Sequence, residues 1–469
     1  MEEDELKQAL SLLERDKQRA NSLLKGFVER YPDNWKGFLC LAGSESILQN
    51  YENAVHYLHI ALYLNPDNSN ILRNLAYCYR QLGQLSLGYF YYQKTFDLNK
   101  WQDPEIAVLL ASSLCELGHH QQGCELLKQA QEKFQRSPLV NFYCFLASDS
   151  STASSAYSRL TQYSLSEIDY LVSFSMKHDA PFYQELDNKS SLSKLIKTYR
   201  KFNQGNHAQD FYPLTFILPE DLEDLQHHPS QSDYWIIKHS NLSGGQGLKV
   251  FNNLSDCQSL PDYNQTVVQK YISNPLLLEN RKFNIRAYIV ILSLHPFRAF
   301  LWQDALIFIA PEIFTLDTEA LGSETIHIAN LLASGGKIHH SKLKHLPGHL
   351  LSLKSLFSIG YFDSNQINSI KTGLEQVGAY ILNLMRFSCI FDHASALAQP
   401  GSYPPKFLGL DIIFDDMFHP WILEVERYPG VGGVFPETKK INNCFKQDYF
   451  SLITQPNFDQ ARHSFLELE

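Results

Sequence analysis

The stretch Lys406-Phe-Leu-Gly-Leu-Asp-Ile-Ile-Phe-Asp-Asp-Met-Phe-His-Pro-Trp-Ile-Leu-Glu-Val-Glu426 predicts two apolar strands joined by a polar turn at Asp415–Pro420. Side chains alternate along a strand, so Glu424 and Glu426 share a face, and Asp411 reaches the same side if the strands are antiparallel. Three such carboxylates raise one another's pKa unless cations lie among them, and their hard oxygens suit Mg²⁺. The alternative is a hairpin with an acidic, solvated face.

Composition limits the class of protein. The chain has 469 residues, 44% of them hydrophobic and 19% charged, which is typical of a soluble globular protein of two or three domains. Its net charge of −10 argues against general binding of nucleic acids or anionic membranes. No segment is long and apolar enough to span a bilayer, and the acidic start lacks a signal-peptide core. Eight cysteines without a C-x-x-C pair indicate reduced thiols and predict a cytoplasmic location.

The first third carries a repeat of 34 residues with the spacing of a tetratricopeptide repeat. One copy opens at Asn34-Trp35. The matching positions in this copy and its neighbours are Ala20, Leu24, Phe27, Pro32, Leu41-Ala42, Tyr51, Ala54, Leu58, Ala61, Pro66, Leu75-Ala76, Tyr79, Leu82-Gly83, Gly88, Tyr92, Leu110-Ala111, Leu117-Gly118, Gly123, Leu127 and Ala130. We therefore predict an all-α domain of helix pairs over residues 1–138, whose concave surface binds a partner protein. A generic helical bundle is the alternative.

Residues 139–200 are predicted to form a helical, Ser-rich connector, which includes Ser148–Ser155, and the sequence pattern changes after it. Strand-like runs then alternate with helical ones, and a helix is predicted over Asp363–Phe391. The predicted strands are Tyr234–Lys238, Lys249–Phe251, Thr266–Tyr271, Ile285–Leu292, Arg298–Trp302, Phe407–Phe414 and Trp421–Glu426. This pattern predicts an α+β domain over 201–469 with a largely antiparallel sheet.

Two further segments favour phosphate chemistry. A strand ends at Lys238 and enters a Gly-rich turn with Gly244, Gly245, Gln246 and Gly247, and such turns offer backbone N–H groups to phosphate oxygens. A plain hairpin needs glycines too.

On a later strand, Lys282, Asn284 and Arg286 share one face. Two cations opposite a carboxylate cluster would suit the neutralisation of a phosphate. The alternative is an ordinary half-solvated strand, in which polar residues also stand at every second position. The apolar run Val267–Ile272 suits an adenine slot or any buried strand.

Taken in order, these segments resemble the tubulin–tyrosine ligase-like family. The resemblance covers about 211–433 and rests on Phe211–Pro219, Ile236-Ile-Lys238 with Ser243–Gly247, Val268-Gln-Lys-Tyr-Ile272, Lys282–Tyr288, His327-Ile-Ala-Asn330, Phe407–Asp411 and Pro420–Glu426. It implies an ATP-grasp fold that binds ATP and Mg²⁺. It also implies a reaction in which a protein carboxylate is activated as an acyl phosphate and joined to the amine of an amino acid.

The same resemblance implies roles for individual residues. Arg286 and Glu424 would be catalytic, with Arg286 near the acceptor or the transferring phosphate. Mg²⁺ would be held by Asp411, Glu424 and Glu426. The nucleotide would be bound by Lys238, Gly244, Gly245, Gln246, Gly247, Gln269, Lys270, Tyr271, Ile272, Lys282, Asn284, His327 and Asn330.

The chain departs from the family pattern at several of these places. Phe308 stands where the family has an arginine, which removes a cation for substrate phosphate or carboxylate. Leu248-Lys249 replaces a basic residue followed by glycine, and Asn284, Ala329 and Glu426 replace aspartate, threonine and asparagine. A divergent substrate is therefore expected.

Two functions remain. The first is an ATP- and Mg²⁺-dependent ligase that adds a free amino acid to a protein acceptor, with the repeats recruiting that protein. The second is a repeat scaffold with an inactive or nucleotide-sensing ATP-grasp domain.

The basic run Lys337–His345 could collect an acidic acceptor tail or be an ordinary exposed loop. Three histidine pairs fit solvated side chains better than a metal site: His119-His120, His227-His228 and His339-His340.

Overall fold

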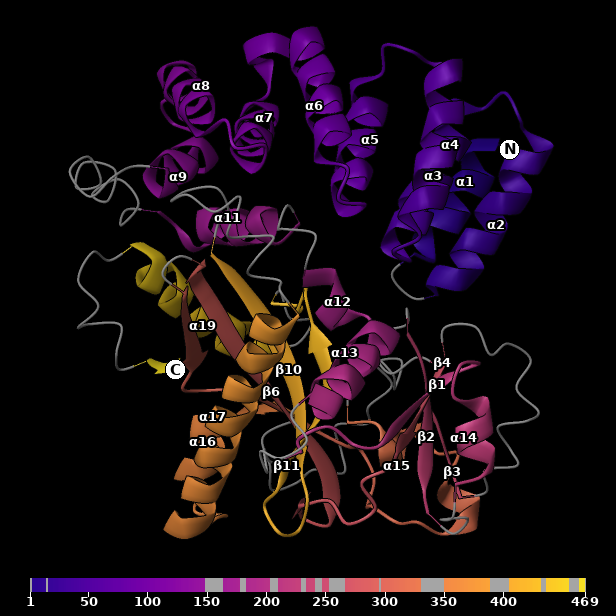
Figure 1. Cartoon of the computed structure of the whole chain (residues 1–469), viewed down its shortest axis with the longest axis vertical. Coiled ribbons are helices and arrows are strands. Elements are labelled where there is room, and N and C mark those ends of the chain that lie inside the picture. Colours follow the sequence, from indigo (N-terminus) through magenta and orange to yellow (C-terminus); the bar gives the residue numbers. More distant parts are fainter. Residues whose placement is uncertain are drawn as a thin grey trace. The chain divides into compact units, whose positions relative to one another are not determined.

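The chain forms two compact units, Met1–Pro181 with Ser395–Pro404, and Phe182–Ala394 with Pro405–Glu469. A computed structural model describes residues 2–13, 16–147, 163–177, 183–202, 210–228, 233–240, 247–252, 266–294, 297–329, 350–388, 405–431, 436–454 and 464–468 (Figure 1). The division after Pro181 falls inside the segment predicted as a connector, and the exact boundaries of the domains stay a prediction. Among the described helices, none is long and apolar enough to cross a membrane.

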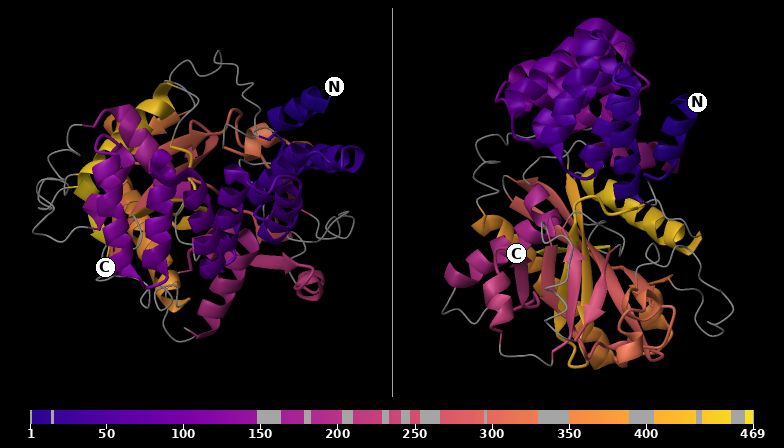
Figure 2. Two further views of the ribbon diagram at one scale, coloured as in Figure 1. Left: turned by 90° about the horizontal axis from the view of Figure 1, so that it is seen from above. Right: turned by 90° about the vertical axis from the view of Figure 1, so that its right-hand side faces the viewer.

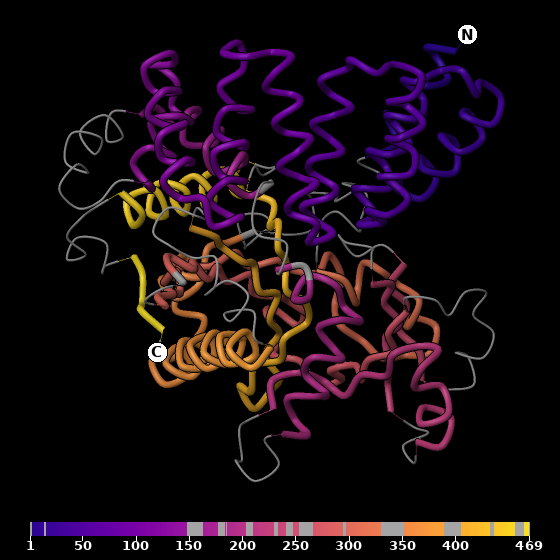
Figure 3. Tube along the Cα trace, turned by 45° about the horizontal axis from the view of Figure 1, so that its top comes forward, coloured from indigo at the N-terminus to yellow at the C-terminus, as the bar shows by residue number. Residues whose placement is uncertain are grey.

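The first unit is a stack of helices, as the repeat predicts. Consecutive helices run up and down beside one another (Figures 1 and 3). They are α1 Glu2–Ser11, α2 Lys17–Arg30, α3 Trp35–Ile47, α4 Tyr51–Leu64, α5 Ser69–Gln81, α6 Leu85–Asn99, α7 Pro104–Glu116, α8 His120–Lys133, α9 Pro138–Leu146 and α11 Leu165–Lys177, with a short 3₁₀ turn at Lys100–Gln102. The prediction of an all-α helical-repeat region is confirmed.

The repeat is visible in how the helices begin. The side chains of Asn34, Asn68 and Asp103 each accept a backbone N–H from the first turn of α3, α5 and α7. Such caps satisfy N–H groups that have no partner within the helix. Because these caps recur once per repeat, the sequence sets where the first helix of each pair starts.

The pairs pack closely where the second helix carries a glycine. A Cβ added to Gly123 of α8 would lie 2.8 Å from the carbonyl oxygen of Ala111 and 2.5 Å from the Sγ of Cys115, both on α7. The glycine therefore allows the backbones of α7 and α8 to approach each other.

Gly123→Ala is expected to lower the free energy of unfolding by about 1–3 kcal/mol, because the new methyl group overpacks this contact. Gly43→Ala in α3 is the matched control, since a Cβ there meets nothing within 4 Å. In a helix interior this control should raise stability by about 0.5–1 kcal/mol. Urea unfolding followed by helical circular dichroism measures both. Equal effects of the two substitutions would contradict the close packing.

The second unit contains two antiparallel sheets (Figure 2). The smaller sheet has the order β1-β4-β2-β3, formed by β1 Thr215–Leu218, β2 Trp235–His239, β3 Lys249–Phe251 and β4 Thr266–Lys270. The larger one follows the order β11-β10-β6-β7-β12, with β8 and β5 also paired to β6 and β9 paired to β8. Its strands are β5 Leu277–Leu278, β6 Arg281–Leu294, β7 Phe297–Trp302, β8 Leu306–Ile309, β9 Leu350–Ser352, β10 Lys406–Phe414, β11 Pro420–Glu426 and β12 Phe465–Leu468.

Helices pack on the larger sheet. The described helices of this unit are α12 Gln184–Asp187, α13 Lys189–Phe202, α14 Leu222–Gln226, α15 Glu324–His327, α16 Leu353–Ser358, α17 Ser364–Phe387 and α19 Pro436–Thr454, with a 3₁₀ turn at Thr318–Ala320. Tyr288 of β6 stacks on Phe445 of α19, with ring centroids 4.2 Å apart. The next residue along β6, Ile289, lies beside Gly378 of α17. Because side chains alternate along a strand, α17 and α19 cover opposite faces.

Strand β10 lies between β11 and β6, and each of its nine residues is buried. The almost continuous apolar sequence of β10 suits this central position. Asp411 is the acidic residue that interrupts it. The α+β fold with antiparallel sheets is confirmed. The sequence prediction placed most of these strands but omitted β1, β5, β8, β9 and β12, which are short or lack a clear alternation.

Candidate functional site

The three predicted carboxylates converge at the β10–β11 hairpin. The strands are antiparallel, and Asp411 is directly opposite Glu424 in the register. Glu426 lies two residues further along the same face of β11, and single carboxylate oxygens of the three residues lie within 4.8 Å of one another. This cluster of hard oxygen ligands fits a divalent cation such as Mg²⁺.

A cation from β6 lies against this cluster. Arg286 is opposite Asp411 in the register of β6 and β10. Its Nε and Nη2 donate to the two carboxylate oxygens of Asp411 at 2.7 and 2.8 Å, and Nη2 also donates to Glu426 at 2.6 Å. Arg286 and both of its partners are thus held by charge-assisted hydrogen bonds in a site that excludes most solvent.

A second cation comes from the helical segment before the sheets. Lys189, the first residue of α13, donates to Oε1 of Glu424 at 2.9 Å and is buried. The sequence analysis missed this residue, because it lies in the predicted connector and 235 positions before its partner. A lysine in the first turn of an amphipathic helix is too common to have revealed it.

The two glutamates respond differently to these charges. Burial alone would raise the pKa of Glu424, but Lys189, Lys238 and Arg286 lower it below its usual value. Burial raises the pKa of Glu426 to about 8 against the pull of Arg286, and the negative charges of Asp411 and Glu424 act in the same direction as burial. The carboxyl group of Glu426 is therefore the member of the cluster whose pKa lies close to neutral pH.

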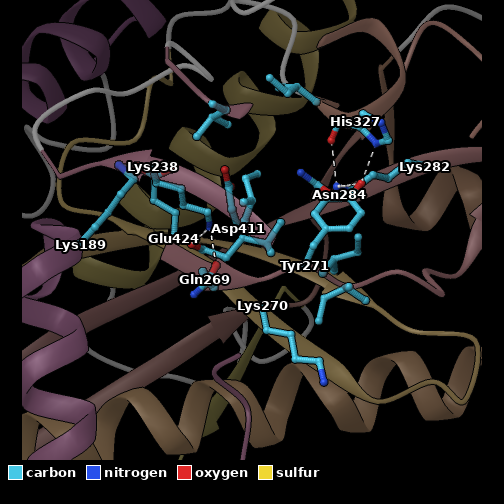
Figure 4. A pocket seen from close by; sticks show the side chains of 16 residues that line it. Lys189, Lys238, Gln269, Lys270, Tyr271, Lys282, Asn284, His327, Asp411 and Glu424 are labelled. Carbon is cyan, nitrogen blue, oxygen red and sulfur yellow. Dashed lines mark hydrogen bonds and ion pairs between the residues drawn. The ribbon is translucent and has the colours of Figure 1, made fainter. Parts of the chain in front are cut away.

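A pocket opens beside Asp411 and Glu424 and encloses about 750 Å³, including its open mouth (Figure 4). Its polar lining contains four lysines. The lining residues are Lys189, Ile236, Lys238, Leu248, Gln269, Lys270, Tyr271, Ile272, Lys282, Asn284, His327, Ile328, Asp411, Ile413, Leu423 and Glu424. Arg286 and Glu426 are absent from this lining and lie behind Asp411. Apolar walls with convergent cations suit a ligand that combines a flat base with phosphates.

Lys238 is fixed at one end of the pocket. Its Nζ donates to Oε1 of Gln269 at 2.6 Å and to the carbonyl oxygen of Leu423 at 3.1 Å. Gln269 in turn donates to Oγ1 of Thr215 at 3.0 Å. Burial lowers the pKa of Lys238 to about 8. The side chain of Gln269 thus positions Lys238, whereas Lys270 points away from this group (Figure 4).

A hydrogen-bonded network fixes Lys282 at the other end. Its Nζ donates to the hydroxyl of Tyr271 at 3.0 Å and to the carbonyl oxygen of His327 at 2.8 Å. Nε2 of His327 lies 3.1 Å from the carbonyl oxygen of Ala320, so this nitrogen carries the proton. Nδ1 then accepts the hydroxyl proton of Tyr271 at 3.0 Å.

This network leaves Lys282 without a carboxylate partner among the contacts described here. Burial lowers the pKa of Lys282 to about 7, and the charge of Lys238 acts in the same direction. Burial and the charge of Lys282 lower the pKa of His327 to about 4. Above pH 7 both side chains are therefore largely neutral, and an anion bound beside Lys282 would raise the pKa of this lysine and make it take up a proton from solvent.

Binding of a nucleotide is expected to take up one proton or more at pH ~8, because the anion raises the pKa of Lys282 from about 7 and that of Lys238 from about 8. The uptake should fall towards zero as the pH drops below 7, where Lys282 is already charged. Calorimetry in buffers of different ionisation enthalpy measures it. Lys282→Met should remove most of the uptake, whereas Lys270→Met is the control, since Lys270 is half-exposed and paired with Asp233. Equal uptake in both variants would contradict the assignment.

Comparison with known proteins decides the family. The model of the tubulin-tyrosine ligase family matches residues 172–463, more than half of the chain, and a tetratricopeptide-repeat model matches residues 5–34. The chain belongs to the tubulin-tyrosine ligase family. The resemblance inferred from the sequence motifs is thereby confirmed, as is the repeat that precedes the family domain.

Curated members of the tubulin-tyrosine ligase family are distant relatives. The human "Probable tubulin polyglutamylase TTLL2" is 27% identical over 285 residues, which are 59% of this chain and 46% of that protein. The human "Tubulin monoglutamylase TTLL4" is 26% identical, covering 53% of this chain and 21% of that protein. "Tubulin glycylase 3C" of Tetrahymena thermophila is 24% identical, covering 51% and 22%. The chain thus covers less than half the length of each of these three relatives.

Two positions at which the sequence analysis predicts a departure from the family pattern adjoin the site. Phe308 of β8 is buried, and its ring lies 5.2 Å from the guanidinium carbon of Arg286. Asn284, its partner in the register, lines the pocket, and its buried Oδ1 has no hydrogen-bond partner among the residues that the structure describes. A buried acceptor of this kind fits a ligand that brings a hydroxyl or amine donor.

Some predicted residues lie outside the described residues. These are Gly244, Gly245 and Gln246 of the Gly-rich turn, Asn330, the segments Ser148–Ser155 and Lys337–His345, and the pair His339-His340. Gly247 is described, is exposed and has a φ of +68°. The remaining nucleotide-site residues of the prediction line the one pocket, and their individual roles stay predictions.

Proposed function

We propose that the chain is an ATP- and Mg²⁺-dependent ligase that forms an amide bond between the amine of a free amino acid and a carboxylate of a protein. The observation that carries this proposal is the pocket in which Asp411 and Glu424 meet Lys189, Lys238 and Lys282. The three relatives named above support the same reaction class, since their names describe the addition of amino acids to tubulin.

In this proposal each group has a physical task. Asp411, Glu424 and Glu426 would hold Mg²⁺, which neutralises phosphate charge when bound. Lys238 and Lys282 lie on the pocket walls and would place the phosphates, while Ile236, Leu248 and Ile328 would exclude water from the base. Arg286 keeps Asp411 oriented through its two hydrogen bonds. The acceptor carboxylate would take the γ-phosphate of ATP to give an acyl phosphate and ADP, and attack by the amine would then form the amide bond and release phosphate.

We expect the helical unit to recruit the protein acceptor, since stacked helix pairs present extended surfaces for protein segments. An acidic acceptor tail fits the lysines of the pocket, and neither a nucleic acid nor a membrane is expected as partner. Which amino acid is transferred depends in part on Phe308, which offers no charge to a substrate carboxylate.

The alternative is a scaffold whose family domain binds nucleotide without turnover. Two observations favour it: the carboxylates already contact Arg286 and Lys189, and Phe308 packs on Arg286. An internally neutralised cluster binds Mg²⁺ only if Lys189 leaves Glu424.

Calorimetry of ATP binding to the intact chain, with and without Mg²⁺, is the first test. Binding that requires Mg²⁺ supports the ligase, and incorporation of a labelled amino acid into an acidic-tailed protein, with release of one ADP per bond, completes it. Mg²⁺-independent binding without incorporation supports the scaffold. Absence of ATP binding to the folded chain refutes both roles for the pocket.

A further inference from the structure

Four exposed apolar side chains gather at one edge of the second unit, away from the pocket. They are Ile313, Ile359, Tyr361 and Met417, which are between 42% and 81% exposed. We call these four residues the edge patch. None of them lines the pocket. Contiguous apolar surface of this kind marks interaction sites, whereas single exposed apolar residues are ordinary.

Hydrogen bonds hold two parts of the edge patch to one turn. The backbone N–H of Glu279, in the turn between β5 and β6, donates to the hydroxyl of Tyr361 at 2.7 Å. The next residue of that turn, Asn280, accepts the backbone N–H of Phe314 at 2.8 Å. Ile313 and Tyr361 therefore flank the same turn, although they lie 48 positions apart in the sequence.

The β10–β11 turn, which carries Met417, is held to the segment before β5, because the backbone N–H of Asp416 donates to the carbonyl oxygen of Asn274 at 2.9 Å. The neighbour of Met417, Phe418, packs on Phe362, with ring centroids 6.3 Å apart. Phe362 follows Tyr361 and contacts its ring. These contacts join the turn that carries Met417 to Tyr361, and Ile359 lies two residues before Tyr361.

The rim of the edge patch is acidic. The segments that carry it, 279–281, 311–314, 359–363 and 415–418, contain one basic residue, Arg281, whose guanidinium donates to the carbonyl oxygen of Pro311. Their acidic residues are Glu279, Glu312, Asp363, Asp415 and Asp416. An apolar centre with a negative rim repels acidic protein tails, nucleic acids and anionic lipid surfaces.

We propose that the edge patch docks a positively charged, amphipathic segment of a partner protein. Methionine and aromatic side chains are enriched at the centres of protein interfaces, and a rim of one sign selects a partner of the other. The docked segment would lie at the tip of the hairpin that carries Asp411 and Glu424. This partner differs from the acidic acceptor expected at the pocket, and the proposal does not depend on ligase activity.

A short amphipathic helix of leucine and lysine is the probe, and the same peptide with glutamate in place of lysine is its counterpart. Fluorescence anisotropy with the intact chain measures the binding of each. The lysine peptide should bind more weakly as salt is added. The double variant Ile359→Lys, Met417→Lys should weaken its binding roughly tenfold or more. Tyr63→Lys, an exposed aromatic residue of α4, is the control and should leave binding unchanged.

Several results would overturn the proposal. The lysine peptide could fail to bind, could bind the double variant as well as the unchanged chain, or could bind no better than the glutamate peptide. Sedimentation that detects a dimer of the chain, lost in the double variant, would assign the edge patch to a second copy instead. Binding to neutral phosphatidylcholine vesicles, lost in the same variant, would assign it to lipid.

Discussion

Arg286→Met is expected to lower the free energy of unfolding of the second unit by about 3–5 kcal/mol. The substitution keeps an apolar stem of similar length and removes the cation that holds Asp411 and Glu426. Asp411, Glu424 and Glu426 would then face one another with Lys189 and Lys238 as nearby cations, of which Lys189 alone is seen in an ion pair with the cluster. Buried carboxylates that lose their partner keep the cost of desolvation without its compensation, so the loss exceeds that of a surface ion pair.

Arg298→Met provides the matched control. Arg298 pairs with Glu467 across β7 and β12, but the two side chains are 31% and 49% exposed to solvent, far more than Arg286 and its partners. Exposed pairs contribute about 0–1 kcal/mol, so this variant should unfold almost as the unchanged chain does. Urea unfolding followed by tryptophan fluorescence compares the two. Similar losses in both variants would show that the Arg286 cluster is no more important to stability than an ordinary surface pair.

Added Mg²⁺ gives the same experiment a second readout. A divalent cation can replace the missing charge in Arg286→Met, so Mg²⁺ should stabilise this variant more than it stabilises the unchanged chain. In Arg298→Met the effect of Mg²⁺ should equal that in the unchanged chain. A failure of Mg²⁺ to raise the stability of Arg286→Met would argue against the carboxylates as a cation site.

The parts of the fold that the sequence predicts are those encoded locally. The alternation around Asp411 and Glu424 places both on one face once the strands pair, and a hairpin with a short polar turn makes that pairing the simplest outcome. The helix pairs follow in the same way, because the caps at Asn34 and Asn68 recur with the repeat.

Contacts between distant segments could not be predicted from local patterns. Arg286 and Asp411 are 125 positions apart, and nothing in either strand says that β6 and β10 are neighbours. Lys189 is a further example, since α13 shows an ordinary amphipathic pattern. The sequence therefore predicts a carboxylate cluster that holds a divalent cation and faces two basic residues, whereas only the fold shows that Arg286 and Lys189 contact the carboxylates directly.

The network at Lys282 shows another limit of sequence patterns. Alternation along β6 predicts that Lys282 shares a face with Asn284 and Arg286, and the structure agrees. The partners of each differ, however: Lys282 contacts Tyr271 and His327, while Arg286 contacts carboxylates. Burial and the charge of Lys238 lower the pKa of Lys282 to about 7, whereas at Arg286 the carboxylates of Asp411 and Glu426 outweigh burial and raise the pKa.

The double substitution Asp411→Asn, Glu424→Gln is expected to abolish ligase turnover, by roughly a thousandfold or more. Both changes keep the shape of the side chain and remove its negative charge. A divalent cation would lose two of its three carboxylate ligands, and the phosphate charge that it neutralises would remain uncompensated in a buried site. ATP binding should accordingly lose its dependence on Mg²⁺.

Asp416→Asn is the matched control for this result. Asp416 belongs to the same hairpin but lies exposed in its turn, where it accepts a hydrogen bond from Asn274. The substitution Asp416→Asn should leave turnover and the Mg²⁺ dependence of ATP binding close to those of the unchanged chain. Labelled amino-acid incorporation measures turnover, and circular dichroism confirms that each variant is folded.

The same pair of variants separates the two functions. If the chain is a ligase, the double variant stops incorporation while the helical unit still binds its protein partner, because that unit folds around its own core. If the chain is a scaffold, both variants behave like the unchanged chain in every assay that reports on the partner, and incorporation is absent from all three. Incorporation that survives in the double variant would contradict both functions. The carboxylates around Arg286 would then have neither a catalytic nor a metal-binding role.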